Sequence, residues 1–227
     1  MNAPILSVAT SAPKISTVRL DIPMTFNPGQ AVQVSFPGDP KKRFYSISSA
    51  PSEGPYIEIT VKSESGSAVA MALAGLRKGD TLEIQGPMGG SLSLPETIQE
   101  PLGFIAAGTG VAPFRSMIRS LIDQKAAVEL WLFHSVSAQT ELLFQDEFRA
   151  WSAAHPNFHY VPTVTRDFDD NWKNETGRIN EELIRKHVTD KPCTFLLCGP
   201  STFVHDMDIA LRQKLKIPAE KIRREKW

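Results

Sequence analysis

Residues 102–124 read LGFIAAGTGVAPFRSMIRSLIDQ, and this stretch decides the fold of the second half of the chain. An apolar run, Leu102–Ala107, leads into a turn with two glycines, Gly108 and Gly110, and then into a helix-like segment, Pro113–Gln124. Glycines let the backbone turn sharply, and amide groups at the start of a helix attract anions such as diphosphates. Pro113 suits the first helical turn, where a missing amide is tolerated. The pattern predicts a strand, a turn and a helix, with or without a bound anion.

The rest of the second half repeats this alternation of strand and helix. The predicted strands are Val128–Phe133, Phe158–Val164 and Thr194–Cys198; the predicted helices are Gln139–Trp151, Asn180–His187 and Thr202–Leu215. Strands that alternate with helices form βαβ units, so we expect a doubly wound parallel sheet with helices on both faces.

The first half has a different pattern, with short β-type runs between Gly- and Pro-rich turns. The predicted strands are Thr17–Asp21, Ala31–Phe36, Arg43–Ser48, Tyr56–Val61 and Thr81–Gln85, with one short helix at Ser67–Leu76. Closely spaced strands of this kind favour a small antiparallel β-barrel. The pattern changes within Leu94–Pro101, so we predict domains at 1–97 and 98–227.

Composition excludes several classes of function. Of the 227 residues, 25 are Lys or Arg and 25 are Asp or Glu, so no net charge favours nucleic acid or a membrane surface. The apolar runs are too short to span a bilayer, and the N-terminus is not a secretory signal. Two cysteines are too few for an iron–sulfur cluster and suit a reducing cytoplasm. The histidines show no metal-ligand spacing, and for His134, at a strand end, a structural role is favoured over contact with a nucleotide.

Two further motifs carry chemistry. On a strand, Arg43-Phe44-Tyr45-Ser46 places Arg43 and Tyr45 on one face, which suits a ligand with a phosphate and an aromatic ring. Cys198-Gly199-Pro200 ends the last predicted strand, on the same rim as Gly108. Taken singly, the first also fits an ordinary strand and the second a buried Cys before a turn.

Together, in this order, the motifs resemble the ferredoxin–NADP⁺ reductase family of flavoproteins. The resemblance extends from about Thr17 to Trp227. It rests on Arg-x-Tyr-Ser at 43–46, the glycine turn ending in Pro at 108–113, and Cys-Gly-Pro at 198–200, and the stretch Glu141–Phe148 also resembles the family's second helix. The resemblance implies an antiparallel flavin-binding barrel followed by a nicotinamide-binding α/β domain.

The resemblance also implies roles for individual residues. Arg43 would bind a flavin phosphate, Tyr45 would stack on the ring, and Ser46 would hydrogen-bond near the atom that receives hydride. Cys198 would lie against the nicotinamide, and Glu225 would belong to the active site. Trp227 would cover the second face of the flavin as a removable lid. Further cofactor-binding residues would be Phe44, Thr60, Val61, Val69, Ala70, Met71, Gly108, Thr109, Gly110, Pro113, Thr165, Arg166, Arg178, Gly199 and Pro200.

Departures from the family pattern leave the cofactors partly open. Ala70 stands where many members have Ser, so phosphate binding would fall to backbone amides, and Ser67 offers an alternative helix cap. FAD is favoured over FMN. For the nicotinamide nucleotide, Arg166 and Arg178 would suit the 2′-phosphate of NADPH. The same loop carries three acidic residues that would repel this phosphate: Asp167, Asp169 and Asp170. NADH is therefore slightly favoured.

The function implied is a flavoprotein reductase that takes hydride from NAD(P)H onto FAD and passes single electrons to a separate carrier. That carrier would be a ferredoxin, a Rieske-type oxygenase or a haem protein. Two alternatives stay open: a reductase of free flavin, and a non-catalytic flavin- or nucleotide-binding subunit of a larger electron-transfer complex. Basic residues near the flavin motif and the C-terminus would attract an acidic partner or simply be solvated: Lys41, Lys42, Arg43, Arg223 and Arg224.

Overall fold

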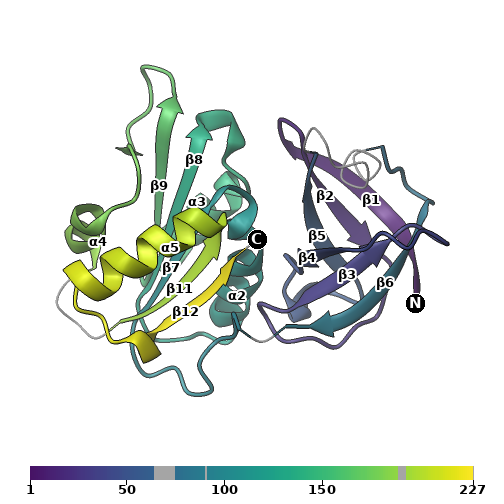
Figure 1. Ribbon diagram of the computed structural model, residues 1–227, viewed down its shortest axis with the longest axis horizontal. Coiled ribbons are helices and arrows are strands. Elements are labelled where there is room, and N and C mark those ends of the chain that lie inside the picture. Colours follow the sequence, from purple (N-terminus) through teal and green to yellow (C-terminus); the bar gives the residue numbers. More distant parts are fainter. Residues whose placement is uncertain (64–74, 90, 189–192, 227) are drawn as a thin grey trace. The chain divides into compact units, whose positions relative to one another are not determined.

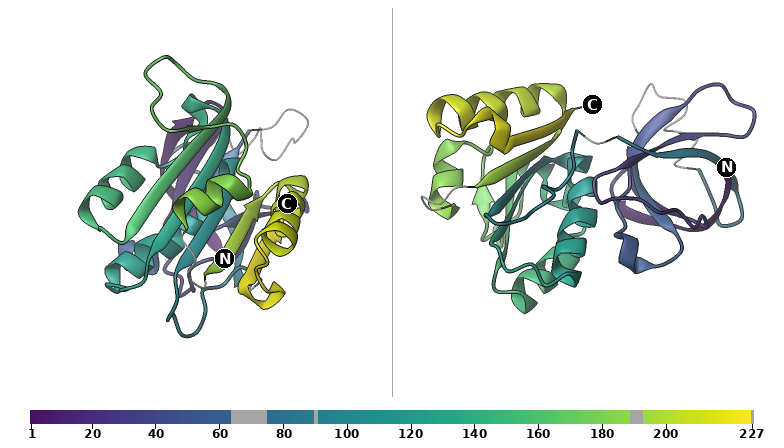
Figure 2. Two further views of the ribbon diagram at one scale, coloured as in Figure 1. Left: turned by 90° about the vertical axis from the view of Figure 1, so that its left-hand side faces the viewer. Right: turned by 90° about the horizontal axis from the view of Figure 1, so that it is seen from below.

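The computed structural model describes residues 1–63, 75–89, 91–188 and 193–226, and the chain divides into two compact units (Figures 1 and 2). The first unit comprises Met1–Ser93 together with Ala112–Gln124, and the second comprises Leu94–Val111 together with Lys125–Trp227. Helix α2 (Ala112–Asp123) therefore belongs to the first unit, although it follows the first strand of the second half in the chain. The domain boundary at residues 97 and 98 stays a prediction.

The first unit is built on six strands. They are β1 (Asn2–Ala12), β2 (Ile15–Leu20), β3 (Ala31–Ser35), β4 (Arg43–Ser46), β5 (Ile57–Lys62) and β6 (Thr81–Met88). Their order is β4-β3-β6-β1-β2-β5, with antiparallel neighbours. An antiparallel bridge between Ile47 and Ile59 joins the two ends of this order, which confirms the antiparallel barrel.

Alternation of apolar and polar residues explains the barrel. Val32 and Val34 of β3 and Ile57 and Ile59 of β5 are fully buried in one cluster, while Gln33, between the two valines, is half-buried. The sequence did not reveal β1, because only Ala3, Ile5 and Ala12 of its eleven residues are buried. The region of the predicted helix at Ser67–Leu76 lies largely outside the described residues.

The second unit is a parallel sheet. Its strands are β7 (Leu102–Ala107), β8 (Leu130–Ala138), β9 (Phe158–Asp167), β10 (Glu175–Thr176), β11 (Thr194–Gly199) and β12 (Ile222–Lys226). Their order is β10-β9-β8-β7-β11-β12, and all the pairings are parallel. The crossovers include α3 (Gln145–Ala154), α4 (Glu181–His187) and α5 (Ser201–Ile209). The α/β class is therefore confirmed.

Helices cover both faces of this sheet. Ile184 of α4 and Val204 and Met207 of α5 pack in one buried cluster with Ile105 of β7 and Phe133 of β8. The views of α5 show it lying across β11 and β12 (Figures 1 and 2). On the opposite face, aromatic side chains of α3 pack against those of β9 in tilted or edge-to-face arrangements: Phe148 and Trp151 against Phe158, and Phe148 against Tyr160.

Several predicted elements differ in extent. The predicted helix Gln139–Trp151 is a 3₁₀ turn, Gln139–Glu141, followed by α3, because Phe144 between them adopts a left-handed conformation with φ of 55°. The last predicted helix ends as a π-helical segment, Ala210–Lys214. The charged stretch at 222–226 forms β12, a strand that the sequence pattern did not show. No helix among the residues that the structure describes is long and apolar enough to cross a membrane.

Candidate functional site

The first candidate site lies where strands β4 and β5 separate. The bridge between Ile47 and Ile59 and the hydrogen bond from the Ser48 amide to the Glu58 carbonyl, 2.8 Å, join the chain on one side. On the other side, the described residues of β4 and β5 form no ladder with each other. If the register of the bridge continued, Ser46 would lie opposite Thr60. The barrel therefore opens beside Ser46, which belongs to the sequence motif, and Thr60, which the family resemblance implied.

Burial along the Arg43–Ser46 strand does not alternate, because Arg43 and Phe44 are both exposed while Tyr45 and Ser46 are both half-buried. Tyr45, the register partner of Val32, packs in part against the barrel core, whereas the side chain of Phe44 is exposed. Arg43 is exposed and Ser46 is half-buried. Because Ile47 and Ile59 face the core, Ser46 and Thr60 face outward on the same side of the strands.

The hydroxyl of Thr60 has no hydrogen-bond partner among the residues that the structure describes. Only 6% of Thr60 is exposed. Buried hydroxyls are normally hydrogen-bonded, so such a group marks a place where a ligand can supply a partner. Val61 beside it is buried. A flavin ring, with polar atoms along its edge, fits this opening. The predicted phosphate-binding residues Val69, Ala70 and Met71 and the predicted lid Trp227 lie outside the described residues.

The second candidate site lies at the carboxyl ends of the parallel strands. Glu225 of β12 is the register partner of Cys198 of β11, Cys198 that of Ala106 on β7, and Ala106 that of His134 on β8. Register partners on parallel strands share a face, so Glu225, Cys198 and His134 lie in one row across the sheet. Cys198 is fully buried, and burial raises the pKa of the Glu225 carboxyl above its ordinary value.

The glycine turn meets the end of β11. A Cβ on Gly110 would lie 2.4 Å from the Cys198 carbonyl oxygen and 2.9 Å from the Gly199 nitrogen, so only glycine permits this approach. Gly108, by contrast, has φ of +55° and open space where a Cβ would be. Thr109 is half-buried beside it, and Pro113 is buried in the first turn of α2. Pro200 is exposed and directly precedes α5. The two predicted nucleotide motifs are thus brought together, with an open cradle at Gly108.

His134 is a residue of this site that sequence reasoning assigned to structure. It is fully buried, and its Nε2 lies 3.1 Å from the carbonyl oxygen of Gly108. A carbonyl only accepts, so Nε2 carries the proton and donates it to the turn. Nδ1 has no partner among the described residues. Burial lowers the pKa of His134 to about 4, and the ring is therefore neutral near pH 7. The sequence placed His134 just after a strand predicted to end at Phe133, but β8 continues to Ala138, so His134 lies in the middle of the strand.

The residues expected to read the nucleotide's ribose lie at the other edge of the sheet. Thr165 and Arg166 belong to β9 itself, which extends to Asp167, and do not follow the strand as predicted. The Gly177 amide donates to the Val164 carbonyl at 2.9 Å, and the Thr163 hydroxyl donates to the Gly177 carbonyl at 2.7 Å. These bonds hold Arg178 next to the end of β9. Arg166 and Arg178 are both exposed.

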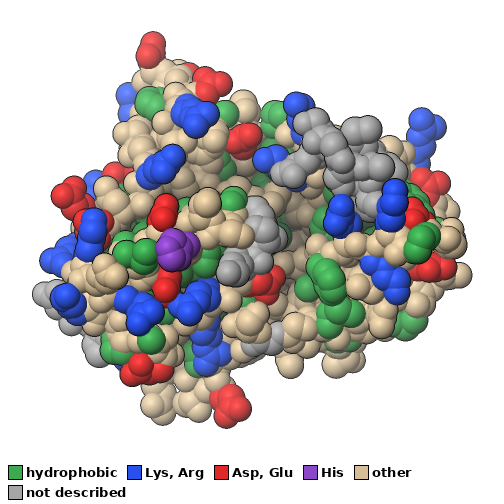
Figure 3. Space-filling view, in the orientation of Figure 1, with side chains coloured by type: hydrophobic (Ala, Val, Ile, Leu, Met, Phe, Trp, Pro, Cys, Tyr) green, Lys and Arg blue, Asp and Glu red, His purple; other side chains and the backbone are tan. Residues whose placement is uncertain are grey.

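The basic residues near the C-terminus are engaged within their own unit. Arg224 pairs with Asp208, and Nη1 of Arg223 donates to the Leu94 carbonyl at 3.2 Å. On the face of the parallel-sheet unit seen in Figure 3, acidic and basic side chains are interspersed. Arg224 therefore has an acidic partner, whereas Arg223 contacts a backbone carbonyl.

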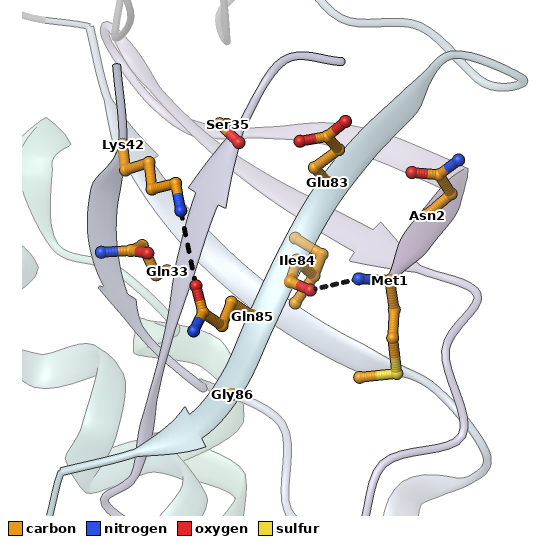
Figure 4. Close-up of a pocket in the computed structure, with 9 residues that line it drawn as sticks. All are labelled: Met1, Asn2, Gln33, Ser35, Lys42, Glu83, Ile84, Gln85 and Gly86. Atoms are coloured by element: carbon orange, nitrogen blue, oxygen red, sulfur yellow. Dashed lines mark hydrogen bonds between the residues drawn. The ribbon is translucent and has the colours of Figure 1, made fainter. Parts of the chain in front are cut away.

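A separate pocket of about 400 Å³ lies on the outer face of the barrel (Figure 4). In it, Lys42 Nζ lies 3.5 Å from Gln85 Oε1, and the Met1 amino group donates to the Ile84 carbonyl at 2.8 Å. Its lining comes from Met1, Lys42 and strands β1, β3 and β6, and includes none of the predicted site residues. The pocket is therefore distinct from the opening between β4 and β5.

Models of known protein families match both halves of the chain. Residues 4–91 match the oxidoreductase FAD-binding domain, and residues 104–208 match the oxidoreductase NAD-binding domain. These two matches define an oxidoreductase with an FAD-binding domain and an NAD-binding domain. The chain belongs to the ferredoxin–NADP⁺ reductase family.

The chain is also similar to individual proteins of known sequence or structure. It is 30% identical over 215 residues to the electron transfer component of toluate 1,2-dioxygenase from Pseudomonas putida, with 94% of this chain and 62% of that protein covered. The structure of the Amycolatopsis cytochrome P450 reductase GcoB matches with a TM-score of 0.90 and 27% identity, covering 100% of this chain and 69% of that one. A ferredoxin NADP⁺ reductase from Neisseria gonorrhoeae, solved with FAD and NADP, matches with a TM-score of 0.83 and 25% identity, covering 100% and 98%. The chain spans between 54% and 62% of three curated relatives.

Proposed function

We propose that this chain is a flavoprotein reductase that oxidises NAD(P)H and passes electrons, one at a time, to a separate protein. The observation that carries the proposal is the row formed by Glu225 and Cys198 beside the glycine cradle, in a chain that also has the β4–β5 opening. Relatives described as an electron transfer component of a dioxygenase and as a cytochrome P450 reductase support a protein acceptor.

Each site has a role in this proposal. Ser46, Tyr45 and Thr60 would hold the flavin ring, and Arg43 with the exposed Phe44 would hold the rest of FAD. Gly108 and the turn into α2 would take the nucleotide's diphosphate, because open backbone at the start of a helix favours an anion. Cys198 and Glu225 would border the nicotinamide. A bound flavin supplies an acceptor for two electrons that can release them singly.

We propose the reducing cytoplasm as the location, which suits the two buried thiols of Cys193 and Cys198. The acceptor classes that the sequence suggested, a ferredoxin, an oxygenase or a haem protein, remain the proposed partners. The domain limits at 1–97 and 98–227 are likewise proposed.

A single experiment tests the reductase function. The full chain is purified, its visible spectrum is recorded, and it is mixed rapidly with NADH and separately with NADPH. We expect tightly held FAD, and loss of its absorbance within the turnover time with at least one nucleotide. A colourless protein that turns over added flavin would show a free-flavin reductase instead. Bound flavin that neither nucleotide bleaches would contradict the reductase proposal.

A further inference from the structure

A buried cluster of charges lies beside the β4–β5 opening, and the proposed function does not use it. Its centre is Arg115 of α2, whose side chain is only 8% exposed. Two carboxylates contact it, those of Glu53 and Glu58, with side chains 16% and 10% exposed. Arg19 of β2 contacts the same Glu58 from the other side, with Nη2 at 2.8 Å from Oε1. Two guanidinium groups thus balance two carboxylates.

Arg115 contacts its partners through both terminal nitrogens of its guanidinium group. Nη2 donates to Glu53 Oε1 at 2.9 Å, and Nη1 donates to Glu53 Oε2 at 3.1 Å. Nη1 also lies 2.9 Å from the Ser48 carbonyl oxygen and 3.3 Å from Glu58 Oε2. A planar guanidinium can reach three partners at once, whereas the ammonium group of Lys cannot reproduce this fork.

These partners hold the closed side of the opening. Ser48 lies two residues after Ser46, and Glu58 lies two residues before Thr60, so on extended chain they share the outward face of Ser46 and Thr60. The Ser48 hydroxyl donates to the Glu58 carbonyl at 3.2 Å, and the Glu58 amide donates to Ser49 Oγ at 3.0 Å. Arg115 therefore contacts both strands immediately beside the point where they separate.

Stability alone does not account for such a cluster. Removing charges from water is unfavourable, and apolar residues of similar volume are often as stabilising as a buried ion pair. The cluster instead fixes local geometry, because each of its hydrogen bonds holds a backbone or side-chain group in place next to the opening. The Ala50 amide donates to Glu53 Oε2 at 2.6 Å, so the cluster also holds the turn that follows Ser49 in place.

We propose that Arg115 is a positioning residue for the flavin site, which fixes the spacing of Ser46 and Thr60 by binding Ser48 and Glu58. The inference rests on the proposed flavin role of Ser46 and Thr60. Arg115 itself does not touch the flavin; it acts through the two strands. A shift of about 1 Å in such a site can lower a rate on the order of a hundredfold.

The test uses the full chain with three variants. Arg115→Met removes every donor at the centre but leaves Glu53 buried without its partner. Arg115→Met with Glu53→Gln also removes that charge, so folding is preserved while the contact to Ser48 is still lost. Arg119→Met, one turn further along α2, removes a more exposed arginine paired with Asp123 and serves as the matched control. FAD dissociation constants and the visible circular dichroism of the bound flavin are measured. Hydrogen–deuterium exchange of residues 46–49 is measured without flavin.

We expect both Arg115 variants to weaken FAD binding roughly tenfold or more, to change the flavin's circular dichroism and to speed exchange at 46–49. Arg119→Met should stay within about twofold of the native protein. Recovery of native FAD affinity and native exchange in the double variant would overturn the proposal, since Arg115 would then only compensate charge. If the native chain binds no FAD, the proposed function fails. The hydrogen–deuterium exchange data then test the role of Arg115. Faster exchange confined to residues 46–49 in the Arg115 variants supports the positioning role, and unchanged exchange refutes it.

Discussion

Glu225 on β12 and Cys198 on β11 are register partners on neighbouring parallel strands. A carboxyl group and a thiol that are far apart in the sequence therefore lie side by side at the end of the sheet where nucleotides bind. The pairing exists because the charged C-terminal stretch forms a strand. The predictions below follow from this row, from the glycine turn beside it and from the barrel opening.

Glu225→Gln should change how stability depends on pH. Burial raises the pKa of Glu225 in the folded protein, so the folded state binds its proton more tightly than the unfolded chain does. The resulting stability is complete below the unfolded pKa and is lost as pH rises through the folded pKa. The variant should therefore gain in melting temperature relative to the native protein at pH 7 and not at pH 4. If the difference in melting temperature between the variant and the native protein were the same at pH 4 and at pH 7, the raised pKa of Glu225 would be refuted.

Ser46→Ala should separate flavin binding from flavin reduction. The variant keeps Tyr45 and Arg43, so we expect it to retain FAD but to be reduced by NAD(P)H on the order of tenfold more slowly or worse. Arg43→Ala should do the opposite and weaken FAD retention, because it removes the guanidinium group proposed to bind a flavin phosphate. Stopped-flow absorbance and FAD titration measure the two effects. Normal reduction of the Ser46→Ala variant would leave Ser46 as a structural part of the flavin-holding strand.

Gly110→Ala should disrupt the nucleotide turn more than Gly108→Ala. The added methyl group at 110 would overlap the Cys198–Gly199 backbone, and overpacking of this kind lowers stability by about 1–3 kcal/mol. At 108 there is space, so only the positive φ opposes Ala, by about 1–2 kcal/mol. Alanine at 110 should also weaken NAD(P)H binding, because the turn must move away from β11. Equal nucleotide affinity in the native protein and the Gly110→Ala variant would contradict this contact.

His134 should make the protein sensitive to acid. Its pKa falls from 6.5 in the unfolded chain to about 4 in the folded protein, because a buried ring resists protonation. The associated stability is present above pH 6.5 and is lost as pH falls through 4, by roughly 3 kcal/mol. His134→Gln should reduce this loss while keeping a donor to Gly108. Chemical denaturation between pH 4 and 7 measures it, with exposed His205→Gln as control. An unchanged acid slope in His134→Gln would exclude His134 as its cause.

Arg178→Ala should shift the choice between NADPH and NADH. The segment at Gly177 holds Arg178 beside the end of β9, where Arg166 lies, and a 2′-phosphate is attracted to paired cations. The loop also carries Asp167, Asp169 and Asp170, which oppose it. If NADPH is used, the variant should lower kcat/KM for NADPH about tenfold and leave that for NADH within twofold. A chain that prefers NADH should show no change with either nucleotide.

The sequence predicted the architecture because its strongest signals are local. Strand, glycine turn and helix at 102–124 lie next to one another in the chain, and the alternation in Ala31–Phe36 marks a barrel strand directly. The strands at 2–12 and 222–226 escaped prediction because they are stabilised by neighbours, β2 and β6 in one case and β11 in the other, rather than by an apolar pattern.

For the candidate site, the sequence supplied residue types and the structure supplied adjacency. Cys198 and Gly108 could be assigned to one rim from strand order alone. That Glu225 lies beside Cys198 in register required the course of β12. The role of Arg115 could not be anticipated, because its partners Ser48, Glu53 and Glu58 are more than fifty residues away in the chain. Long-range polar contacts of this kind leave no periodic pattern.

The placement of α2 means that the barrel is encoded by two separated stretches of sequence. A gene fragment cut after residue 97 would contain every barrel strand but would lack Arg115, the guanidinium that balances Glu53 and Glu58. Among the described residues, Glu58 would then keep only Arg19 as a cation partner, and Glu53 would lose Arg115, the cation that pairs with it. The halves of this chain are therefore not interchangeable modules: transplanting the flavin-binding half into another reductase requires the helix that follows the glycine turn to be transplanted with it.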